Sequence, residues 1–302
     1  SALSYADNAL QTTLAAGERP GDPAILEVEP RTSVLRVESM VVTGEAGAEE
    51  DIILTRLPGA DPPRVRLSGV IPLRRDWDGE LAVPAPALFA AAAFRDVLEA
   101  RGVTVAAGVE TSSHPLPASA RVLAAHEGVP LARLIEEVNK ESQNLHAELL
   151  LLRLGLAARG EGTTEAGLEA VAEFLDRQAV PREGWGLKDG SGLSHTNVVT
   201  PRGLAALLVA MDRHPHAEVF RASLPVAGVE GTLDARMRGT TAEGRVRAKS
   251  GAMQRVQALA GYVTTAGGNR LAFVLVVNNH VTRGASARRA IDALSIRLAE
   301  AR

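Results

Sequence analysis

Arg247-Ala248-Lys249-Ser250-Gly251-Ala252 predicts the start of a small β-sheet, because two strand-like segments follow it directly. Residues 256–265 and 270–278 are rich in Val, Leu and Ala, and Ala266-Gly267-Gly268-Asn269 between them is typical of a hairpin turn. We therefore expect a strand over 245–249 that leads into a β-hairpin. The cation, hydroxyl and glycine at the end of this strand could together hold a carboxylate, although the same tripeptide also occurs in exposed polar turns.

The residues on both sides of this sheet predict helices. Thr200 and Pro201 make a sound N-cap and first turn for one of them. The expected helices cover residues 131–140, 145–158, 164–178, 201–213 and 285–299. Helices that precede an antiparallel sheet, with one closing helix after it, make an α+β domain.

The first third of the chain favours strands instead. Apolar residues alternate with polar ones in segments between Ala24 and Val70, and Pro and Gly mark the turns. A helix is expected from Pro86, because apolar residues that include Phe94 recur after it at helical spacing. Residues 103–105 are expected to form a further strand.

A linker is expected over residues 112–117, where Ser and Pro are frequent. It divides the chain into two predicted domains. Residues 1–116 form a β-rich domain, and residues 117–302 form the α+β domain.

Composition excludes several classes of protein. The 302 residues carry a formal net charge of -3, so there is no basic excess to neutralise the phosphates of a nucleic acid. The chain has no Cys, which excludes disulfides, thiolate nucleophiles and Cys-based zinc sites. Only Lys140, Lys188 and Lys249 are lysines, and a catalytic proton acceptor can be Lys but hardly Arg. We expect that any targeting segment has been removed or lies outside this sequence.

A second polar motif, Ser142-x-Asn144, falls between two of the expected helices. A short turn there would project a hydroxyl and a carboxamide in the same direction. Either residue could instead cap the following helix, since Ser and Asn are favoured at N-caps. The downstream Lys249-Ser250-Gly251 favours a functional site built from both motifs.

Two further stretches have competing interpretations. Residues 188–194 are Gly-rich and typical of a tight loop; they do not match the hydrolase elbow G-x-S-x-G, because Asp189 stands two positions before Ser191. His146-Ala147-Glu148 fits part of a zinc-deaminase motif, but that motif also requires Cys-x-x-Cys. We expect no metal site and no cofactor.

The chain resembles the low-molecular-mass class C penicillin-binding proteins of the D-alanyl-D-alanine carboxypeptidase/endopeptidase type. The resemblance rests on stretches that follow one another at family-like spacing: 142–148, 189–194, 248–251 and the strand pair 259–265 and 271–274. It implies a penicillin-binding-protein or β-lactamase-like transpeptidase domain, of which 117–302 is the C-terminal part. Residues 1–116 would then be an accessory domain of the kind that this family inserts into its catalytic domain.

The resemblance also implies roles for individual residues in acyl transfer on D-Ala-D-Ala stem peptides. Ser142 would relay a proton to the leaving amine, and Asn144 would bind the substrate's backbone amide. Lys249 would supply positive potential for the terminal carboxylate. The implied substrate-binding residues are Ser250, Gly251 and Ala252, with Ser250 donating to the carboxylate and the Ala252 N–H serving as one of two oxyanion-hole donors.

One departure from the family pattern concerns the nucleophile. The family's nucleophilic Ser and activating Lys lie in a Ser-x-x-Lys motif, but no Ser of this chain precedes a Lys by three positions. The residues in those positions are Glu137, Trp185 and Val246. We expect the motif to lie in an N-terminal segment that precedes this sequence.

Two functions therefore remain open. The first is a serine D-Ala-D-Ala carboxypeptidase/endopeptidase that acts outside the cytoplasm, in the periplasm or cell wall. Its expected partners are peptidoglycan stem peptides as substrates, β-lactams as inhibitors, and the segment that carries the nucleophile. The second is a non-catalytic relative that binds peptidoglycan or acts as a scaffold.

Overall fold

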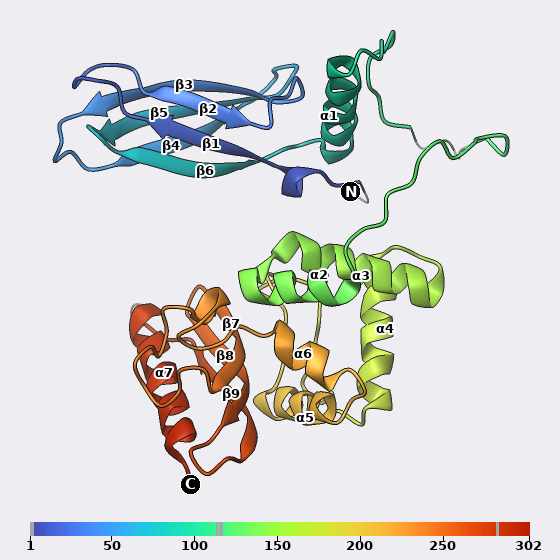
Figure 1. Cartoon of the computed structure of the whole chain (residues 1–302), viewed down its shortest axis with the longest axis vertical. Helices are drawn as coiled ribbons and strands as arrows, with labels where there is room; N and C mark the ends of the chain where they lie inside the picture. Colours follow the sequence, from blue (N-terminus) through green and yellow to red (C-terminus); the bar gives the residue numbers. More distant parts are fainter. Residues whose placement is uncertain (1–2, 113, 115–116, 282–283) are drawn as a thin grey trace. The chain divides into compact units, whose positions relative to one another are not determined.

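The computed structural model describes residues 3–112, 114, 117–281 and 284–302. The chain divides into two compact units, Ser1–Val122 and Leu123–Arg302. Figure 1 shows that the first unit is mainly β and that the second combines helices with a small sheet. Residues 113, 115 and 116 of the expected linker lie outside the described residues.

Unit 1 contains two three-stranded sheets (Figure 1). The first has the order β2-β1-β6 and is antiparallel, and its strands are β1 (Ala9–Ala15), β2 (Ile25–Glu29) and β6 (Asp76–Ala82). The second has the order β3-β5-β4, and its strands are β3 (Arg36–Gly44), β4 (Asp51–Leu57) and β5 (Arg64–Pro72). β3 and β5 are parallel, whereas β4 and β5 are antiparallel. A 3-10 turn (Ala6–Asn8) precedes β1.

The core of unit 1 follows from the two-residue period of its strands. Leu10 and Leu14 of β1 are fully buried, as are Val65 and Leu67 of β5. The expectation of strands between Ala24 and Val70 is confirmed, but β1 and β6 lie outside that range. β6 escapes recognition because acidic residues occupy most of its exposed positions and a glycine lies at its centre.

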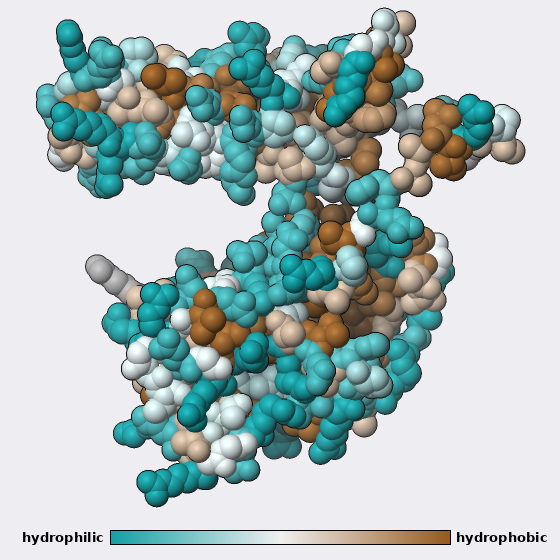
Figure 2. Space-filling model, viewed as in Figure 1, coloured by the Kyte–Doolittle hydropathy of each residue, from teal (hydrophilic) through white to brown (hydrophobic). Residues whose placement is uncertain are grey.

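Helix α1 (Pro86–Ala100) is confirmed, but it buries a different face from the expected one. Its buried residues are Phe89 and Ala92, whereas Phe94 is 65% exposed. Figure 2 shows brown, apolar surface over this helix. The strand expected over 103–105 is wrong, because these residues pair with no described strand and Val103 is 49% exposed.

Unit 2 is an α+β domain, as expected. Its helices are α2 (Leu131–Glu137), α3 (Asn144–Arg159), α4 (Thr164–Arg177), α5 (Pro201–Asp212), α6 (Ala217–Ser223) and α7 (Gly284–Glu300). Its antiparallel sheet has the order β7-β8-β9, with β7 (Val246–Met253), β8 (Val256–Thr264) and β9 (Arg270–Asn278). Among the described residues, no helix has the length and apolar character needed to cross a membrane.

The sheet of unit 2 is covered on both faces. α7 packs on one face, where Ile291 joins Ala248, Leu259 and other buried residues. α5 and α6 lie on the other (Figure 1), where Tyr262 donates a hydrogen bond of 2.6 Å to the carbonyl oxygen of Leu208. Burial, with the nearby charge of Asp212, raises the pKa of Tyr262 to about 12.

Two local details differ from the sequence prediction. β7 continues to Met253, so Lys249-Ser250-Gly251 lies within the strand and not at its end. The strand extends because β7 and β8 pair without interruption up to the two-residue turn at 254–255. Helix α6 was not expected, since it is only seven residues long and follows Pro215 closely.

Candidate active site

Ser142 ends a π-helical turn (Val138–Ser142, the π turn) that continues α2. Its φ of 60° lies in the left-handed region, which non-glycine residues rarely adopt. Gln143 occupies the N-cap position of α3, so neither Ser142 nor Asn144 acts as the cap. The Ser142 hydroxyl instead accepts a hydrogen bond of 2.7 Å from Nζ of Lys249, 107 residues later in the chain.

Lys249 is a partly buried cation with no anionic partner among the described residues. Its Nζ donates to Ser142 Oγ and, at 2.9 Å, to the carbonyl oxygen of Ser250. It forms no ion pair with any residue that the structure describes. Burial lowers the pKa of Lys249 from its usual 10.5, because no carboxylate in the described structure offsets the loss of hydration. The site therefore has a positive charge that a bound anion can neutralise.

The backbone of β7 presents hydrogen-bonding groups at its open edge. In an antiparallel pair, facing residues alternate between hydrogen-bonded and non-hydrogen-bonded positions. The bond of 3.0 Å from N of Thr264 to O of Arg245 sets this alternation for β7 and β8. Ser250 and Ala252 consequently fall on non-hydrogen-bonded positions, where N–H and C=O point away from β8.

The first half of this edge is covered by residues 225–227. The N–H of Ala227 donates to the carbonyl of Val246 at 2.9 Å, and the N–H of Ala248 donates to the carbonyl of Pro225 at 3.0 Å. Within the described part of the chain, no acceptor bonds the N–H of Ala252. This donor remains available to a ligand.

Ser250 and Gly251 complete the exposed end of the site. The Ser250 hydroxyl lies 3.0 Å from that of Thr232, which belongs to a 3-10 turn (Gly231–Leu233). A Cβ added at Gly251 would meet only the side chain of Ala258, at 3.7 Å, and the φ of Gly251 is not positive. The fold therefore tolerates a side chain at this position, and its absence keeps space beside Lys249 open.

Asn144 is the first residue of α3, and its side chain is exposed. It forms no side-chain hydrogen bond within the part of the chain that the structure describes. The structure thus joins Ser142, Lys249 and Ser250 by direct hydrogen bonds. It leaves Asn144, like the Ala252 N–H, free to bind a ligand.

The Gly-rich loop is attached to α3 by Glu148. The carboxylate of Glu148 accepts hydrogen bonds from the N–H groups of Gly190 and Ser191, at 3.1 and 3.0 Å, and from the Ser191 hydroxyl. Burial alone would raise the pKa of Asp189, but donors from Asn197 and from the loop backbone outweigh it and lower that pKa. Residues 188–194 form a loop, as expected. Glu148 anchors this loop to α3 through its hydrogen bonds with Gly190 and Ser191.

Two residues near the site were not predicted from the sequence. Glu148 anchors the Gly-rich loop, and Thr232 lies next to Ser250. Glu148 lies one helical turn after Asn144, a spacing that could have pointed to it. Thr232 carries no comparable signal. Among the described residues, no group of three or more His, Cys, Asp or Glu side chains could hold a metal ion.

A Lys-Ser-Gly strand at the open edge of an antiparallel sheet, facing a Ser-x-Asn turn, is the arrangement of the class that comprises penicillin-binding proteins and class A β-lactamases. The chain belongs to the D-Ala-D-Ala carboxypeptidase 3 (S13) family, whose sequence pattern matches residues 1–301.

Curated relatives agree with this family. The chain is 38% identical over 287 residues to a D-alanyl-D-alanine carboxypeptidase from an Actinomadura species, a match that covers 93% of this chain and 52% of the relative. It is 31% identical over 252 residues to carboxypeptidase DacB of Mycolicibacterium smegmatis, covering 80% of this chain and 54% of the relative. The chain therefore spans about half the length of these relatives.

A solved structure agrees with the fold. Penicillin binding protein 4 (DacB) from Haemophilus influenzae, solved in complex with a β-lactam, superposes with a TM-score of 0.79 at 24% identity. The superposition covers 98% of this chain and 69% of that structure. The predicted penicillin-binding-protein fold is confirmed.

Proposed function

We propose that the protein is a serine D-Ala-D-Ala carboxypeptidase or endopeptidase that cleaves peptidoglycan stem peptides through an acyl-enzyme. The observation that carries the proposal is the hydrogen bond between Lys249 and Ser142 at the open edge of β7. It unites two motifs that are 107 residues apart, beside a cation with no described anionic partner. Such a cation suits a substrate that ends in a carboxylate.

The residues of the site take complementary roles in this reaction. Lys249 and Ser250 bind the terminal carboxylate of the substrate, and Asn144 binds its backbone amide. When the nucleophilic serine attacks the peptide carbonyl, the Ala252 N–H is one of two donors that stabilise the developing oxyanion. Ser142 relays to the leaving amine the proton that the attacking serine loses, and the bond from Lys249 holds the Ser142 hydroxyl in place for this transfer.

This proposal places the nucleophile outside residues 1–302. The family's Ser-x-x-Lys motif is not in this sequence, where Glu137, Trp185 and Val246 stand three positions before the lysines. We propose that the full-length protein supplies this motif from a preceding segment. Because peptidoglycan lies outside the cytoplasm, the proposal also implies an extracytoplasmic location.

Fluorescent penicillin tests the proposed function. The full-length protein is expected to form a stoichiometric covalent adduct, measured by intact-protein mass spectrometry, whereas residues 1–302 alone are expected to form none. A full-length protein that forms no adduct contradicts the enzymatic proposal and favours the non-catalytic peptidoglycan-binding relative. An adduct on residues 1–302 contradicts the assignment of the nucleophile to another segment.

A further inference from the structure

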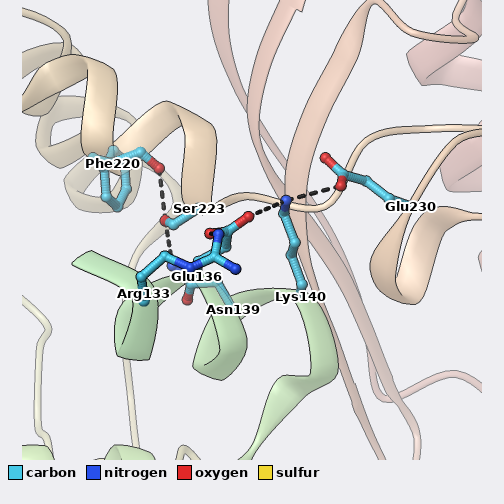
Figure 3. A network of polar contacts seen from close by, with 7 residues as sticks. All are labelled: Arg133, Glu136, Asn139, Lys140, Phe220, Ser223 and Glu230. Atoms are coloured by element: carbon cyan, nitrogen blue, oxygen red, sulfur yellow. Dashed lines mark hydrogen bonds and ion pairs between the residues drawn. The ribbon is translucent and has the colours of Figure 1, made fainter. Parts of the chain in front are cut away.

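Lys140, two residues before Ser142, joins two carboxylates from different parts of unit 2 (Figure 3). Its Nζ lies 2.7 Å from Oε1 of Glu136 on α2 and 2.8 Å from Oε2 of Glu230. Glu230 directly precedes the 3-10 turn Gly231–Leu233, which is the 3-10 turn meant below. The Lys140 side chain is 15% exposed. Burial alone would lower its pKa, but the hydrogen bonds and charges of the two carboxylates outweigh it and raise the pKa. Lys140 therefore stays charged and bridges both segments.

The backbone of the 3-10 turn lies directly against the π turn. Gly231 has a φ of 63°, and a Cβ added there would stand 2.9 Å from the carbonyl oxygen of Lys140 and 3.2 Å from its Cα. A side chain at this position would both strain the backbone and push the two turns apart. The Lys140–Glu230 ion pair and this close contact hold the two turns together.

The π turn is also fixed on its other side (Figure 3). Nδ2 of Asn139 donates a hydrogen bond of 2.8 Å to the hydroxyl of Ser223, which donates at 2.7 Å to the carbonyl oxygen of Phe220 on α6. Ser223 is 1% exposed. The π turn is thus a fixed support for the 3-10 turn.

The contact of Gly231 with the π turn sets the position of Thr232, which follows Gly231 directly. The Thr232 hydroxyl lies 3.0 Å from that of Ser250, at the open end of β7 beyond Lys249. Both hydroxyls are accessible from solvent in the described structure. A carboxylate has two oxygens that each accept hydrogen bonds, and two adjacent hydroxyls can serve them together.

We propose that Thr232 is a further substrate-binding residue, whose hydroxyl joins that of Ser250 in binding the terminal carboxylate of the substrate. Lys140 and Glu230 are positioning residues, since their ion pair keeps the 3-10 turn against the π turn. This inference rests on the proposed function, because the carboxylate belongs to the D-Ala-D-Ala end of the stem peptide.

The test uses the full-length protein, after its adduct with fluorescent penicillin has been verified. Absence of that adduct contradicts the proposed function, so this failure is separate from a failure of the Thr232 inference. Thr232→Val is expected to raise KM for a D-Ala-D-Ala peptide about tenfold, as expected for a lost hydrogen bond to a charged group. Thr232→Ser is expected to restore KM to within about threefold of the unmodified protein.

A pair of ligands separates carboxylate binding from a general structural role. The dissociation constant of a non-hydrolysable peptide with a free C-terminal carboxylate is expected to rise about tenfold in Thr232→Val, while that of its C-terminal amide stays within about twofold. Equal losses for both ligands, or no loss for either, overturn the inference. Thr13→Val is the matched control, because the Thr13 hydroxyl also forms a hydrogen bond with one side chain, that of Asp78 at 2.8 Å, but on β1 of unit 1.

A double-mutant comparison tests the positioning residues. Glu230→Gln is expected to weaken binding of the carboxylate peptide about threefold, and to have no further effect when combined with Thr232→Val. Fully additive losses contradict the positioning role. Lys140→Met provides a second variant of the same ion pair. Arg182→Met is the control, since it breaks an ion pair of 2.7 Å with Asp176 away from the site.

Discussion

Two lysines of unit 2 lie close to Ser142 but in opposite surroundings. Lys140 is held by two carboxylates, which raise its pKa, whereas Lys249 has no described anionic partner and burial lowers its pKa. A compensated cation stabilises the structure that surrounds it. An uncompensated cation costs desolvation energy and regains it only when an anion binds. On this difference rests our proposal that Lys140 is a structural residue and Lys249 a functional one.

Of the variants that distinguish the two lysines, Lys249→Ala should have the largest effect, which is on the acylation rate. In the full-length protein it should reduce the acylation rate with penicillin by about 10²-fold or more, because both the hydrogen bond to Ser142 and the charge are lost. The melting temperature should change little, since no ion pair is broken.

Lys188→Ala is the matched control for that variant, since Lys188 is exposed and is the third lysine of the chain. It should leave the acylation rate unchanged. A near-normal rate in Lys249→Ala would remove Lys249 from the site.

A methyl group beside Lys249 tests whether the open space there serves a ligand. Gly251→Ala should leave stability almost unchanged, because the new Cβ meets only Ala258, at 3.7 Å. It should reduce the acylation rate about tenfold, since the methyl group occupies space beside Lys249, where we expect the substrate. Thermal denaturation and stopped-flow acylation measure the two effects. A stability loss with normal kinetics would mean that Gly251 serves the fold alone.

The pH dependence of ligand binding tests whether the charge of Lys249 takes part in binding a carboxylate. The charge of Lys249 is lost as pH rises through its lowered pKa, so affinity for a carboxylate peptide should fall at a pH below 10.5, the usual value for lysine. Binding of the corresponding amide should depend less on pH. Isothermal titration between pH 7 and about 10.5 measures both affinities. Parallel curves for the two peptides would argue against a role for the Lys249 charge.

The smallest effect is on stability and concerns Lys140. Lys140→Met should lower the free energy of unfolding by about 1 kcal/mol, because Glu136 and Glu230 lose their shared partner but remain partly solvated. Urea denaturation measures this change. Lys249→Met should not lower stability, and a larger loss there than in Lys140→Met would reverse the structural and functional assignments.

Local patterns explain why much of the fold was predictable from the sequence. The hairpin turn at 266–269 and the helix that begins at Thr200 and Pro201 depend on adjacent residues, and both occur as expected. The buried face of α1 depends on what packs against it, so spacing alone pointed to Phe94 in place of Phe89. Residues 103–105 had strand-like composition but no pairing partner in the described structure.

The candidate site was predictable as a set of motifs but not as a geometry. The pattern around Ser142 and Lys249 pointed to both residues, whereas their hydrogen bond depends on the packing of the π turn against β7. The left-handed backbone of Ser142 has no sequence signature, since Ser is not favoured in that region. Thr232 lies beside Ser250 because Gly231 packs against Lys140. This tertiary contact cannot be predicted from a local sequence pattern.

Titration of the lysine side chains would show whether Lys249 is the uncompensated cation of the site. Residues 1–302 contain three lysines, so ¹³Cε-labelled lysine gives three resonances that single Lys→Arg variants assign. We expect the pKa of Lys249 to lie below 10.5 and that of Lys140 to lie above 10.5. Equal pKa values for the two residues, or the reverse order, would contradict the assignment of Lys249 as the uncompensated cation of the site.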